Sequence, residues 1–290
     1  MQELYTNYKS LLFTLAYQLT GSVSDAEDVV QDVFLKIYDV PPEKLAEPKA
    51  YLCKMVTNRC RDLHKSARKK REQYVGEWLP EPFLTSPDDS MESAVVRDDL
   101  LSYAMIVLLE RLSPSERAVF VLREALGFDY QEIAGLVDKS EPNCRKLFSR
   151  ARAKMGIDQE ELVRPESESA GSEWVQGFLA ALKQGNLNEV LSMLSQEVEL
   201  VTDGGGKASV IPRPIATRRR VAAFLLGPLR QIATLAGQLS IELVQLNGQP
   251  GLILRSDEGT RSAVLFHVEG DAIRNFYIVR NPDKLTHIGA

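Results

Sequence analysis

The spacing of apolar residues changes once along this chain, at residues 165–172, PESESAGS. Before this stretch, apolar residues recur three and four positions apart, which predicts amphipathic α-helices. After it, they alternate with polar residues or form short continuous runs, which predicts strands together with a few helices. At 290 residues, the chain is long enough for two or three domains. The expected fold class is therefore multidomain, with all-α parts first and an α+β part last.

The first 38 residues predict two helices. Residues 2–20 form an amphipathic pattern that ends at Gly21, and Ser24 is expected to N-cap the second helix. The core stripe of the second helix consists of Ala26, Val29, Val30, Val33, Phe34 and Ile37. Its outer side carries Asp28, Gln31 and Asp32. On their own, these polar residues are typical of the acidic start of a helix.

A strongly basic helix is predicted at Lys49–Arg71, which holds nine Lys/Arg residues and one acid. Its apolar face consists of Leu52, Met55, Val56, Cys60 and Leu63. Another face carries Lys54, Asn58, Arg61, Lys65 and Arg68. Cations bind phosphates and an amide can meet a base edge, so this face fits DNA; a solvated basic surface is the alternative. The proline-bounded loop Asp39–Pro48 before the helix is either a pocket for an unstacked base or a simple connection.

A helix-turn-helix is predicted between residues 113 and 155. Ser113 and Glu116 form a capping box, Asp129 and Glu132 form a second one, and Ser140 is expected to cap the last helix. The outer face of that last helix carries Glu141, Asn143, Arg145, Lys146, Ser149, Arg150 and Lys154. In such a motif the second helix enters the major groove of DNA.

The charge of the chain is segregated, although the total is only −5. Residues 72–99 carry eight acids and one Arg, whereas residues 139–154 carry six Lys/Arg and one Glu. This pattern argues against general coating of nucleic acid and favours focused contacts. Three cysteines, an odd number on predicted helices, indicate a reducing cytoplasm. No apolar run predicts a membrane span, no signal peptide opens the chain, and Cys60 with His64 makes a poor metal site.

The segments AEDVVQDVFLKIY and PKAYLCKMVTNRCRDLHKSARKKRE together resemble region 2 of a bacterial extracytoplasmic-function (ECF) sigma factor. LSPSERAVFVLREALGFDYQEIAGLV and EPNCRKLFSRARAKM resemble region 4. The resemblance implies that Asp28, Gln31 and Asp32 bind the clamp coiled coil of the RNA polymerase β′ subunit. It also implies that Lys54, Asn58, Arg61, Lys65 and Arg68 bind the −10 promoter element. Region 4 would meet the β flap and read the −35 element through Glu141, Asn143, Arg145, Lys146, Ser149 and Arg150.

The C-terminal part predicts helices first and then an antiparallel meander. Helices are expected at Glu173–Lys183, Asn186–Leu194 and Thr217–Ile232. Strands are expected at Val198–Val201, Leu239–Leu246, Gly251–Arg255, Ser262–Val268 and Ile273–Val279, with hairpin turns at Asn247-Gly248 and Glu269–Asp271. This order resembles a SnoaL-like (NTF2-like) cone, and ECF sigma factors with such an extension form a recognised branch.

Three motifs in this chain match that branch. They are Trp78, Leu79, Pro80, Glu81 and Pro82; Asp203, Gly204, Gly205, Gly206 and Lys207; and Asn281, Pro282, Asp283, Lys284 and Leu285. The expected domains are region 2 (1–71), an acidic linker (72–99), region 4 (100–163), a second linker (164–172) and the SnoaL-like domain (173–290). We expect the second and third motifs to lie together and hold the first, so that the domain regulates the sigma factor in cis. It would either hold a closed, inactive form or assist binding to polymerase.

Other functions for the C-terminal domain are less well supported. Asp203 and His267 are the only plausible catalytic pair in the cone, and a lone His on a strand is more often structural. We therefore assign no catalytic residue, no cofactor and no metal, and leave open a small apolar ligand in the cone. The rival interpretations are a helix-turn-helix regulator with a ligand-sensing domain and a SnoaL-type enzyme with a DNA-binding appendage. The sigma factor is expected to be monomeric when free of polymerase.

Overall fold

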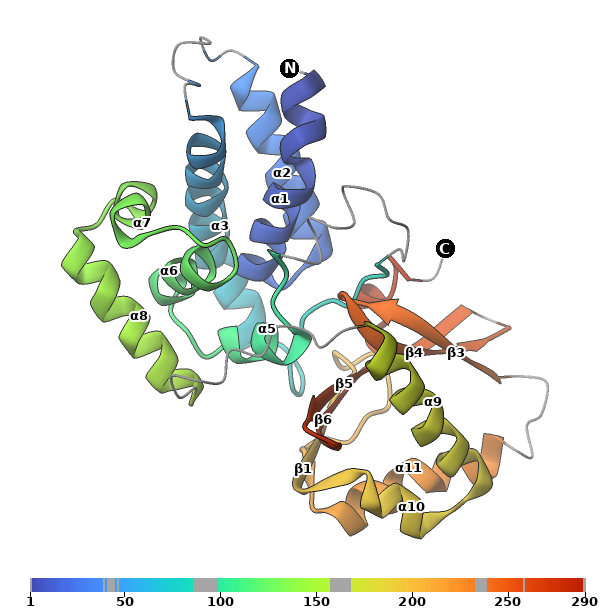
Figure 1. The fold of residues 1–290 in the computed structure, drawn as a ribbon. Coiled ribbons are helices and arrows are strands. Elements are labelled where there is room, and N and C mark those ends of the chain that lie inside the picture. Colours follow the sequence, from blue (N-terminus) through green and yellow to red (C-terminus); the bar gives the residue numbers. More distant parts are fainter. Residues whose placement is uncertain are drawn as a thin grey trace. The chain divides into compact units, whose positions relative to one another are not determined.

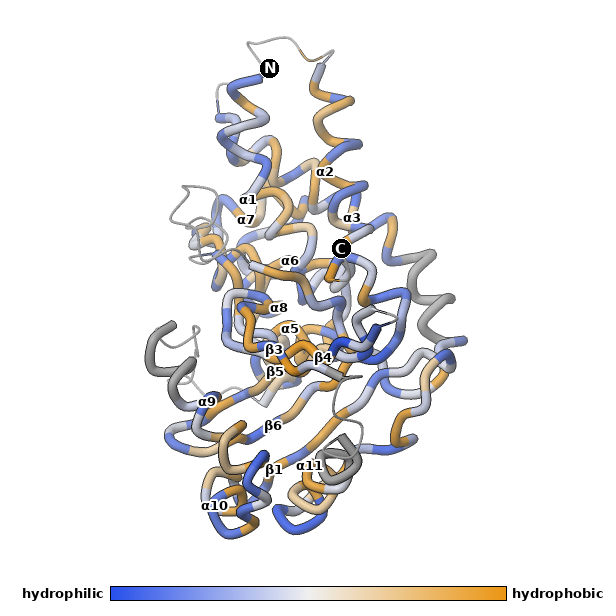
Figure 2. Tube along the Cα trace, turned by 90° about the vertical axis from the view of Figure 1, so that its right-hand side faces the viewer, coloured by the Kyte–Doolittle hydropathy of each residue, from blue (hydrophilic) through white to orange (hydrophobic). Residues whose placement is uncertain are grey.

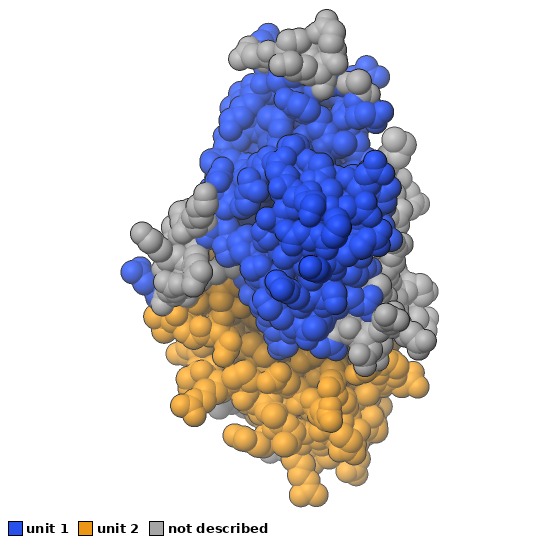
Figure 3. All heavy atoms as spheres, turned by 90° about the vertical axis from the view of Figure 1, so that its left-hand side faces the viewer, with its two compact units in different colours: residues 1–73, 87–101, 105–164 blue, residues 74–86, 102–104, 165–290 orange. Residues whose placement is uncertain are grey.

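The structure is a computed structural model that describes residues 2–38, 40, 45, 47–85, 99–156, 168–232, 239–257 and 259–288. The chain forms two compact units, which Figure 3 colours separately. Unit 1 comprises residues 1–73, 87–101 and 105–164, and unit 2 comprises residues 74–86, 102–104 and 165–290. The expected region 2 thus falls in unit 1, as does the expected region 4 apart from residues 102–104, and part of the expected acidic linker falls in unit 2.

Unit 1 begins with a three-helix arrangement of α1 (Gln2–Thr20), α2 (Val23–Ile37) and α3 (Pro48–Glu72) (Figure 1). The predicted stripe of α2 is buried at Ala26, Val29 and Val33, and hydrophobic and hydrophilic residues alternate along this helix in Figure 2. The basic helix α3 likewise buries Leu52, Cys53, Val56 and Cys60. Packing of these stripes leaves the polar faces of α2 and α3 outside the core.

The start of α2 differs from the prediction. Ser22, not Ser24, is the N-cap, because its backbone is extended and its side chain accepts a hydrogen bond from the Asp25 backbone at 3.2 Å. Ser24 already lies inside the helix. Gly21 ends α1 as predicted, and its φ of 69° is the left-handed geometry that glycine adopts without strain.

The second half of unit 1 contains most of α5 (Tyr103–Leu109), whose first two residues belong to unit 2, together with α6 (Pro114–Glu124), α7 (Tyr130–Val137) and α8 (Glu141–Met155). Both predicted capping boxes are present, at the starts of α6 and α7. Ser140 is the N-cap of α8 but makes no side-chain capping bond. Helix α5 was not predicted, because its sequence YAMIVLL is apolar throughout and shows no helical period.

Buried Arg117 on α6 connects the two halves of unit 1. Its guanidinium donates hydrogen bonds to the carbonyls of Leu109 and Leu19 and forms a 2.8 Å ion pair with Glu110. Only 2% of the Arg117 side chain is exposed, so these partners are what makes its burial tolerable. Because Leu19 belongs to α1, this cation anchors α6 on the N-terminal helices.

Unit 2 contains α9 (Glu168–Gln184), α10 (Leu187–Ser192) and α11 (Arg218–Ile232) packed against a mixed six-stranded sheet. The strands are β1 (Leu194–Asp203), β2 (Ile215–Ala216), β3 (Leu239–Leu246), β4 (Gln249–Ser256), β5 (Gly259–Glu269) and β6 (Ala272–Val279), in the order β2-β1-β6-β5-β4-β3. The predicted antiparallel meander is formed by β3 to β6. Two features were missed, the parallel pairing of β1 with β6 and the short strand β2.

The core of unit 2 lies between the helices and one face of the sheet. Phe178 of α9 packs against Phe266 and Phe276, with ring centroids 6.1 and 5.7 Å away. The predicted hairpin at Asn247-Gly248 has positive φ at both residues, as this turn requires. The α+β fold class expected for this part of the chain is confirmed. Among the described residues, no helix is both long and apolar enough to cross a bilayer.

Candidate functional site

Helix α8 presents the polar face expected of a DNA-reading helix. Cys144, Ala151 and Met155 are buried on its inner side. Asn143, Arg145, Lys146, Ser149 and Arg150 lie on the outer side with Glu141, each of them exposed or half-buried. Arg145 is held in place by a 2.7 Å ion pair with Glu141 and by the Tyr130 ring, whose centroid lies 4.4 Å from the guanidinium carbon. The structure therefore brings together all six residues predicted for this surface.

On α3, the residues predicted to meet DNA differ in their surroundings. Arg61 is exposed, whereas Asn58 is half-buried with a buried side-chain oxygen that has no hydrogen-bond partner. Lys54 donates to Asp138 at 2.7 Å and to the carbonyl of Gly135 at 2.9 Å. The side chains of Lys65 and Arg68 lie outside the described residues, as does most of the loop Asp39–Pro48.

The contact of Lys54 links the two predicted DNA-reading elements. Asp138 is the C-cap of α7, in the left-handed conformation, at the turn before α8. The hydrogen bond from Lys54 lowers the pKa of the Asp138 carboxyl, which favours its ionised form. In this packed form of unit 1, the ammonium of Lys54 is bonded to the helix-turn-helix, at Asp138 and Gly135.

The outer face of α2 carries more than the polar residues predicted there. Asp28 and Gln31 lie on this face, and Asp32 is half-exposed in a 2.8 Å ion pair with Arg59 of α3. Leu35 and Tyr38 continue the same face and are 64% and 76% exposed. These two exposed apolar side chains make the outer face of α2 a candidate surface for a partner. In the sequence, Leu35 and Tyr38 could have been recognised as exposed because they lie outside the apolar stripe predicted for this helix.

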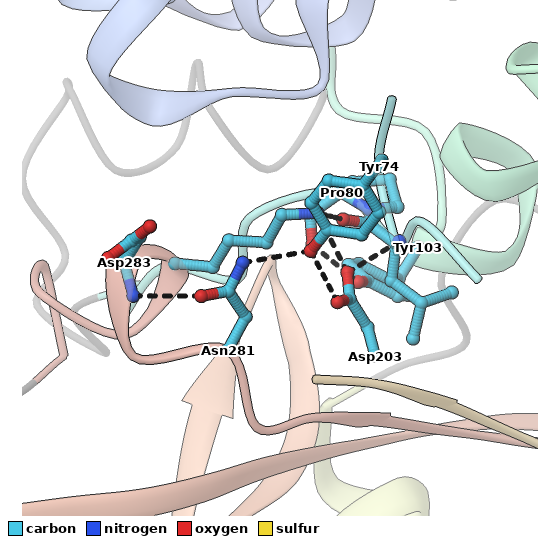
Figure 4. Close-up of polar contacts among 8 residues, drawn as sticks. Tyr74, Pro80, Tyr103, Asp203, Asn281 and Asp283 are labelled. Atoms are coloured by element: carbon cyan, nitrogen blue, oxygen red, sulfur yellow. Dashed lines mark hydrogen bonds and ion pairs between the residues drawn. The ribbon is translucent and has the colours of Figure 1, made fainter. Parts of the chain in front are cut away.

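The third group of predicted residues is assembled within unit 2, around residues 74–85, which we call the connector segment. Asp203, at the end of β1, is fully buried and accepts hydrogen bonds from the Leu79 backbone at 2.9 Å and from Tyr74 at 2.5 Å (Figure 4). Lys284 is also buried, pairs with Asp203 at 2.7 Å and donates to the Leu79 carbonyl at 2.5 Å. One ion pair therefore binds both backbone groups of Leu79.

Aromatic rings and an amide complete this cluster. The ammonium of Lys284 lies 3.9 Å from the centroid of the Trp78 ring and 4.8 Å from that of Tyr74. Asn281 donates to the Tyr74 oxygen at 2.8 Å. Burial, with the hydrogen bond to Asp203, raises the pKa of the Tyr74 hydroxyl well above its ordinary value of 10.0. Sequence reasoning missed Tyr74, because it directly follows the basic helix and belongs to none of the three motifs.

The glycines of the second motif allow this close approach. Gly205 has a φ of 57°, and a Cβ at this position would lie 2.3 Å from the Asn281 side-chain nitrogen. The remaining motif residues lie around the cluster: Leu79, Pro80, Pro82, Gly204 and Leu285 are buried, Glu81 is half-buried, and Gly206, Lys207, Pro282 and Asp283 are exposed. Lys207 and Asp283 form an exposed ion pair of 2.5 Å.

The connector segment has two further attachments in unit 2. The Tyr103 hydroxyl, at the start of α5, donates to the Pro80 carbonyl at 2.7 Å, and its ring lies 5.4 Å from that of Tyr277. Phe83 exchanges hydrogen bonds with Asn247, and the Thr85 backbone donates to the Gln245 carbonyl at 3.0 Å. The end of the connector segment thus adds to the edge formed by the β3–β4 hairpin.

The geometry does not form the catalytic or metal arrangements considered from the sequence. Both oxygens of Asp203 are taken by the connector cluster, and His267 contacts Asn275 on the neighbouring strand at 3.1 Å. In the part of the chain that the structure describes, no three His, Cys, Asp or Glu side chains lie close enough to hold a metal ion. The three cysteines are buried, and burial raises the pKa of Cys53 to about 12, which makes it unreactive.

Comparison with known proteins identifies the family of the helical parts of the chain. Residues 4–70 match the family Sigma-70 region 2, and residues 103–155 match Sigma-70, region 4. The chain is 33% identical over 287 residues to the ECF RNA polymerase sigma factor SigJ of Mycobacterium tuberculosis, covering 95% of this chain and 90% of that protein. This chain belongs to the ECF sigma factor family.

The similarity extends to all parts of this sigma factor. The crystal structure of Mycobacterium tuberculosis SigJ superposes with a TM-score of 0.80 at 30% identity and covers 99% of each chain. The probable ECF RNA polymerase sigma factor SigI of the same species is 28% identical over 287 residues, which is 98% of this chain and 94% of SigI. Sigma factors bind core RNA polymerase and promoter DNA, so the helix-turn-helix and the basic helix α3 belong to a transcription initiation factor.

Proposed function

We propose that this ECF sigma factor is regulated in cis by its C-terminal domain. The connector segment joins regions 2 and 4 in the sequence. By holding this segment, the domain keeps the two regions packed together in a closed form that does not initiate transcription. The observation that carries the proposal is the buried ion pair of Asp203 and Lys284, which binds the backbone N–H and carbonyl of Leu79. Burying two charges costs free energy unless both are well satisfied, and here the connector segment supplies the remaining partners.

Holding the connector segment shortens the distance that the linker between regions 2 and 4 can span. Residues 72–99, fully extended, span up to about 90 Å. When Tyr103 is bonded to Pro80, only the eight residues from Gln73 to Pro80 separate the end of α3 from the start of α5, a reach of about 28 Å. Promoter elements near −10 and −35 lie about 25 base pairs, or about 85 Å, apart at about 3.4 Å per base pair. Release of the connector segment therefore favours simultaneous binding of both elements.

The packed form of unit 1 supports the same proposal. Lys54, a residue we assign to the −10 element, is bonded to Asp138 beside the −35-reading helix. Regions 2 and 4 must separate before each can meet its own element. We assign Asp28, Gln31 and Asp32, together with Leu35 and Tyr38, to the β′ clamp coiled coil. Region 4 would contact the β flap.

We assign the DNA contacts to two helical surfaces. The −10 surface comprises Lys54, Asn58, Arg61, Lys65 and Arg68. The −35 surface comprises Glu141, Asn143, Arg145, Lys146, Ser149 and Arg150. The second surface combines cations for phosphates with amide, hydroxyl and carboxylate groups for base edges.

Run-off transcription with core polymerase at limiting sigma factor tests the proposal. Tyr103→Phe removes the hydrogen bond to Pro80 and keeps the aromatic ring, so we expect a few-fold more transcript, as loss of one hydrogen bond predicts. Trp78→Ala removes the ring over Lys284 and should act in the same direction. Leu187→Ala, at an exposed position of α10, is the control. Unchanged output from both Tyr103→Phe and Trp78→Ala would rule the proposal out.

A further inference from the structure

The C-terminal domain has a basic surface that the connector site does not use. Arg213 precedes β2, and Arg218, Arg219 and Arg220 open α11. Arg213, Arg219 and Arg220 are exposed, and Arg218 is half-buried with an Nε atom that is buried and lacks a hydrogen bond. We call these four residues the arginine surface. Within the described residues, none of the four takes part in an ion pair.

Several other cations of the same domain are in ion pairs. Arg274 contacts Glu197, Arg255 contacts Glu242, and Lys207 contacts Asp283. One acid, Glu199, is near the arginine surface, because it pairs across the sheet with Ala216 of β2. The surface therefore keeps a net charge of +3 from four arginines and one glutamate. A local excess of one sign in a chain of net charge −5 indicates a partner of the opposite sign.

Stability of the fold does not explain these side chains. Cations in the first turn of a helix are unfavourable, because the N-terminal end of the helix dipole is positive. Helix α11 has three arginines there and no acid in its first turn. Exposed arginines also bury little apolar surface, so their removal should leave the fold intact.

We infer that the arginine surface binds the phosphate backbone of promoter DNA, as a contact additional to those of regions 2 and 4. The inference rests on the sigma factor's binding of promoters and not on the capture of the connector segment. Arginine suits phosphate because its planar guanidinium donates two parallel hydrogen bonds and is weakly hydrated. Contacts to phosphates do not distinguish one base from another. The arginine surface should therefore add affinity for DNA without a preference for its sequence.

The salt dependence of promoter binding by the holoenzyme tests this inference. The logarithm of the binding constant falls linearly with the logarithm of the salt concentration. Removing one contact between a cation and a phosphate makes this slope less steep by about 0.9. Arg219→Gln/Arg220→Gln should therefore lower the slope by about 1 to 2, equally for promoters of different −35 sequence. The control Lys183→Gln/Arg261→Gln changes the net charge by the same amount at exposed positions of α9 and β5 and should leave the slope unchanged. Equal slopes for the wild type and the Arg219/Arg220 variant would overturn the inference.

Cross-linking separates DNA from an acidic protein surface as the partner. The native cysteines are buried, so Arg220→Cys introduces an accessible thiol for a photo-cross-linker. In the holoenzyme–promoter complex, we expect label on the DNA strands. Label confined to polymerase subunits would overturn the inference, whereas Lys183→Cys should label neither DNA nor polymerase. Because neither readout depends on the amount of transcript, failure of the cis-regulation proposal would leave this test intact.

Discussion

Lys284 and Asp203 form an ion pair of 2.7 Å in which their side chains are 6% and 0% exposed. The two residues come from the last motif of the chain and from the end of β1, 81 positions apart. Neither charge faces water, and both are also bonded to Leu79 of the connector segment. The pair thus holds Leu79 of the connector segment in the interior of the C-terminal domain.

Lys284→Met should destabilise unit 2 severely. Removing one partner leaves the Asp203 carboxylate buried without a cation, which costs about 3–5 kcal/mol in the free energy of unfolding. Lys207→Met is a matched control, because it breaks an ion pair with Asp283 whose side chains are 55% and 60% exposed. Exposed pairs contribute less than about 1 kcal/mol. Chemical denaturation of the two variants measures the difference, and similar losses would contradict the burial argument.

Gly205→Ala should weaken the connector site more than its backbone strain accounts for. A Cβ at Gly205 would lie 2.3 Å from Asn281 Nδ2 and 2.9 Å from the Tyr74 hydroxyl. Gly270→Ala has almost the same φ, 59° against 57°, but open space around its Cβ. The control should lose about 1–2 kcal/mol from the left-handed backbone alone. Amide hydrogen exchange in residues 74–85 should accelerate only in Gly205→Ala; acceleration in both variants would assign the effect to strain.

Alkaline pH should loosen the connector site through Tyr74. Its pKa is raised in the folded protein, so its contribution to stability is complete below pH 10 and is lost as pH rises through the folded value. Fluorescence of Trp78 reports the change in a Trp174→Phe background, because the chain has only these two tryptophans. Tyr74→Phe should remove the part of the transition that begins near pH 10. An unaltered transition in that variant would show that another group titrates.

Asp138→Asn should weaken the attachment of Lys54 to the helix-turn-helix without disturbing the turn before α8, leaving only hydrogen bonds such as that to the Gly135 carbonyl. Asp138 has a φ of 53°, a left-handed geometry that asparagine tolerates. With the ion pair gone, the sigma factor without polymerase should bind a −10 oligonucleotide a few-fold more tightly, since an exposed pair stabilises the packed form weakly. Glu27→Gln, an equal charge change at an exposed position of α2, is the control. If both variants bound the −10 oligonucleotide with equal affinity, the contact between Lys54 and Asp138 would not limit DNA binding.

Local features of the fold followed from the sequence. The capping boxes at Ser113 and Asp129 and the hairpin at Asn247 depend on side chains within three or four positions, so their residue types identify them. Helix α5 escaped because a helix buried on nearly all sides has no polar face to reveal its period. Strand β2 escaped because it is only two residues long.

Long-range partners were the least predictable part of the candidate site. The resemblance to a known branch of sigma factors indicated that Asp203 and Lys284 lie near Trp78, but it did not indicate Tyr74 or Tyr103. These tyrosines bind groups 129 and 23 positions away, and no local pattern encodes such distances. The contact of Lys54 with Asp138 was missed for the same reason, because the pattern of α3 shows only which side of the helix is polar.

A disulfide between the connector segment and the C-terminal domain tests the central claim most directly. A Cβ at Gly206 would lie 3.2 Å from that of Val75, close to the roughly 3.5–4.5 Å of disulfides, and Val75 is 65% exposed. Run-off transcription by Val75→Cys/Gly206→Cys should be low when oxidised and return to the wild-type level on reduction, whereas each single variant should be insensitive to oxidation. Equal transcript from the oxidised and reduced double variant would contradict regulation through the connector segment.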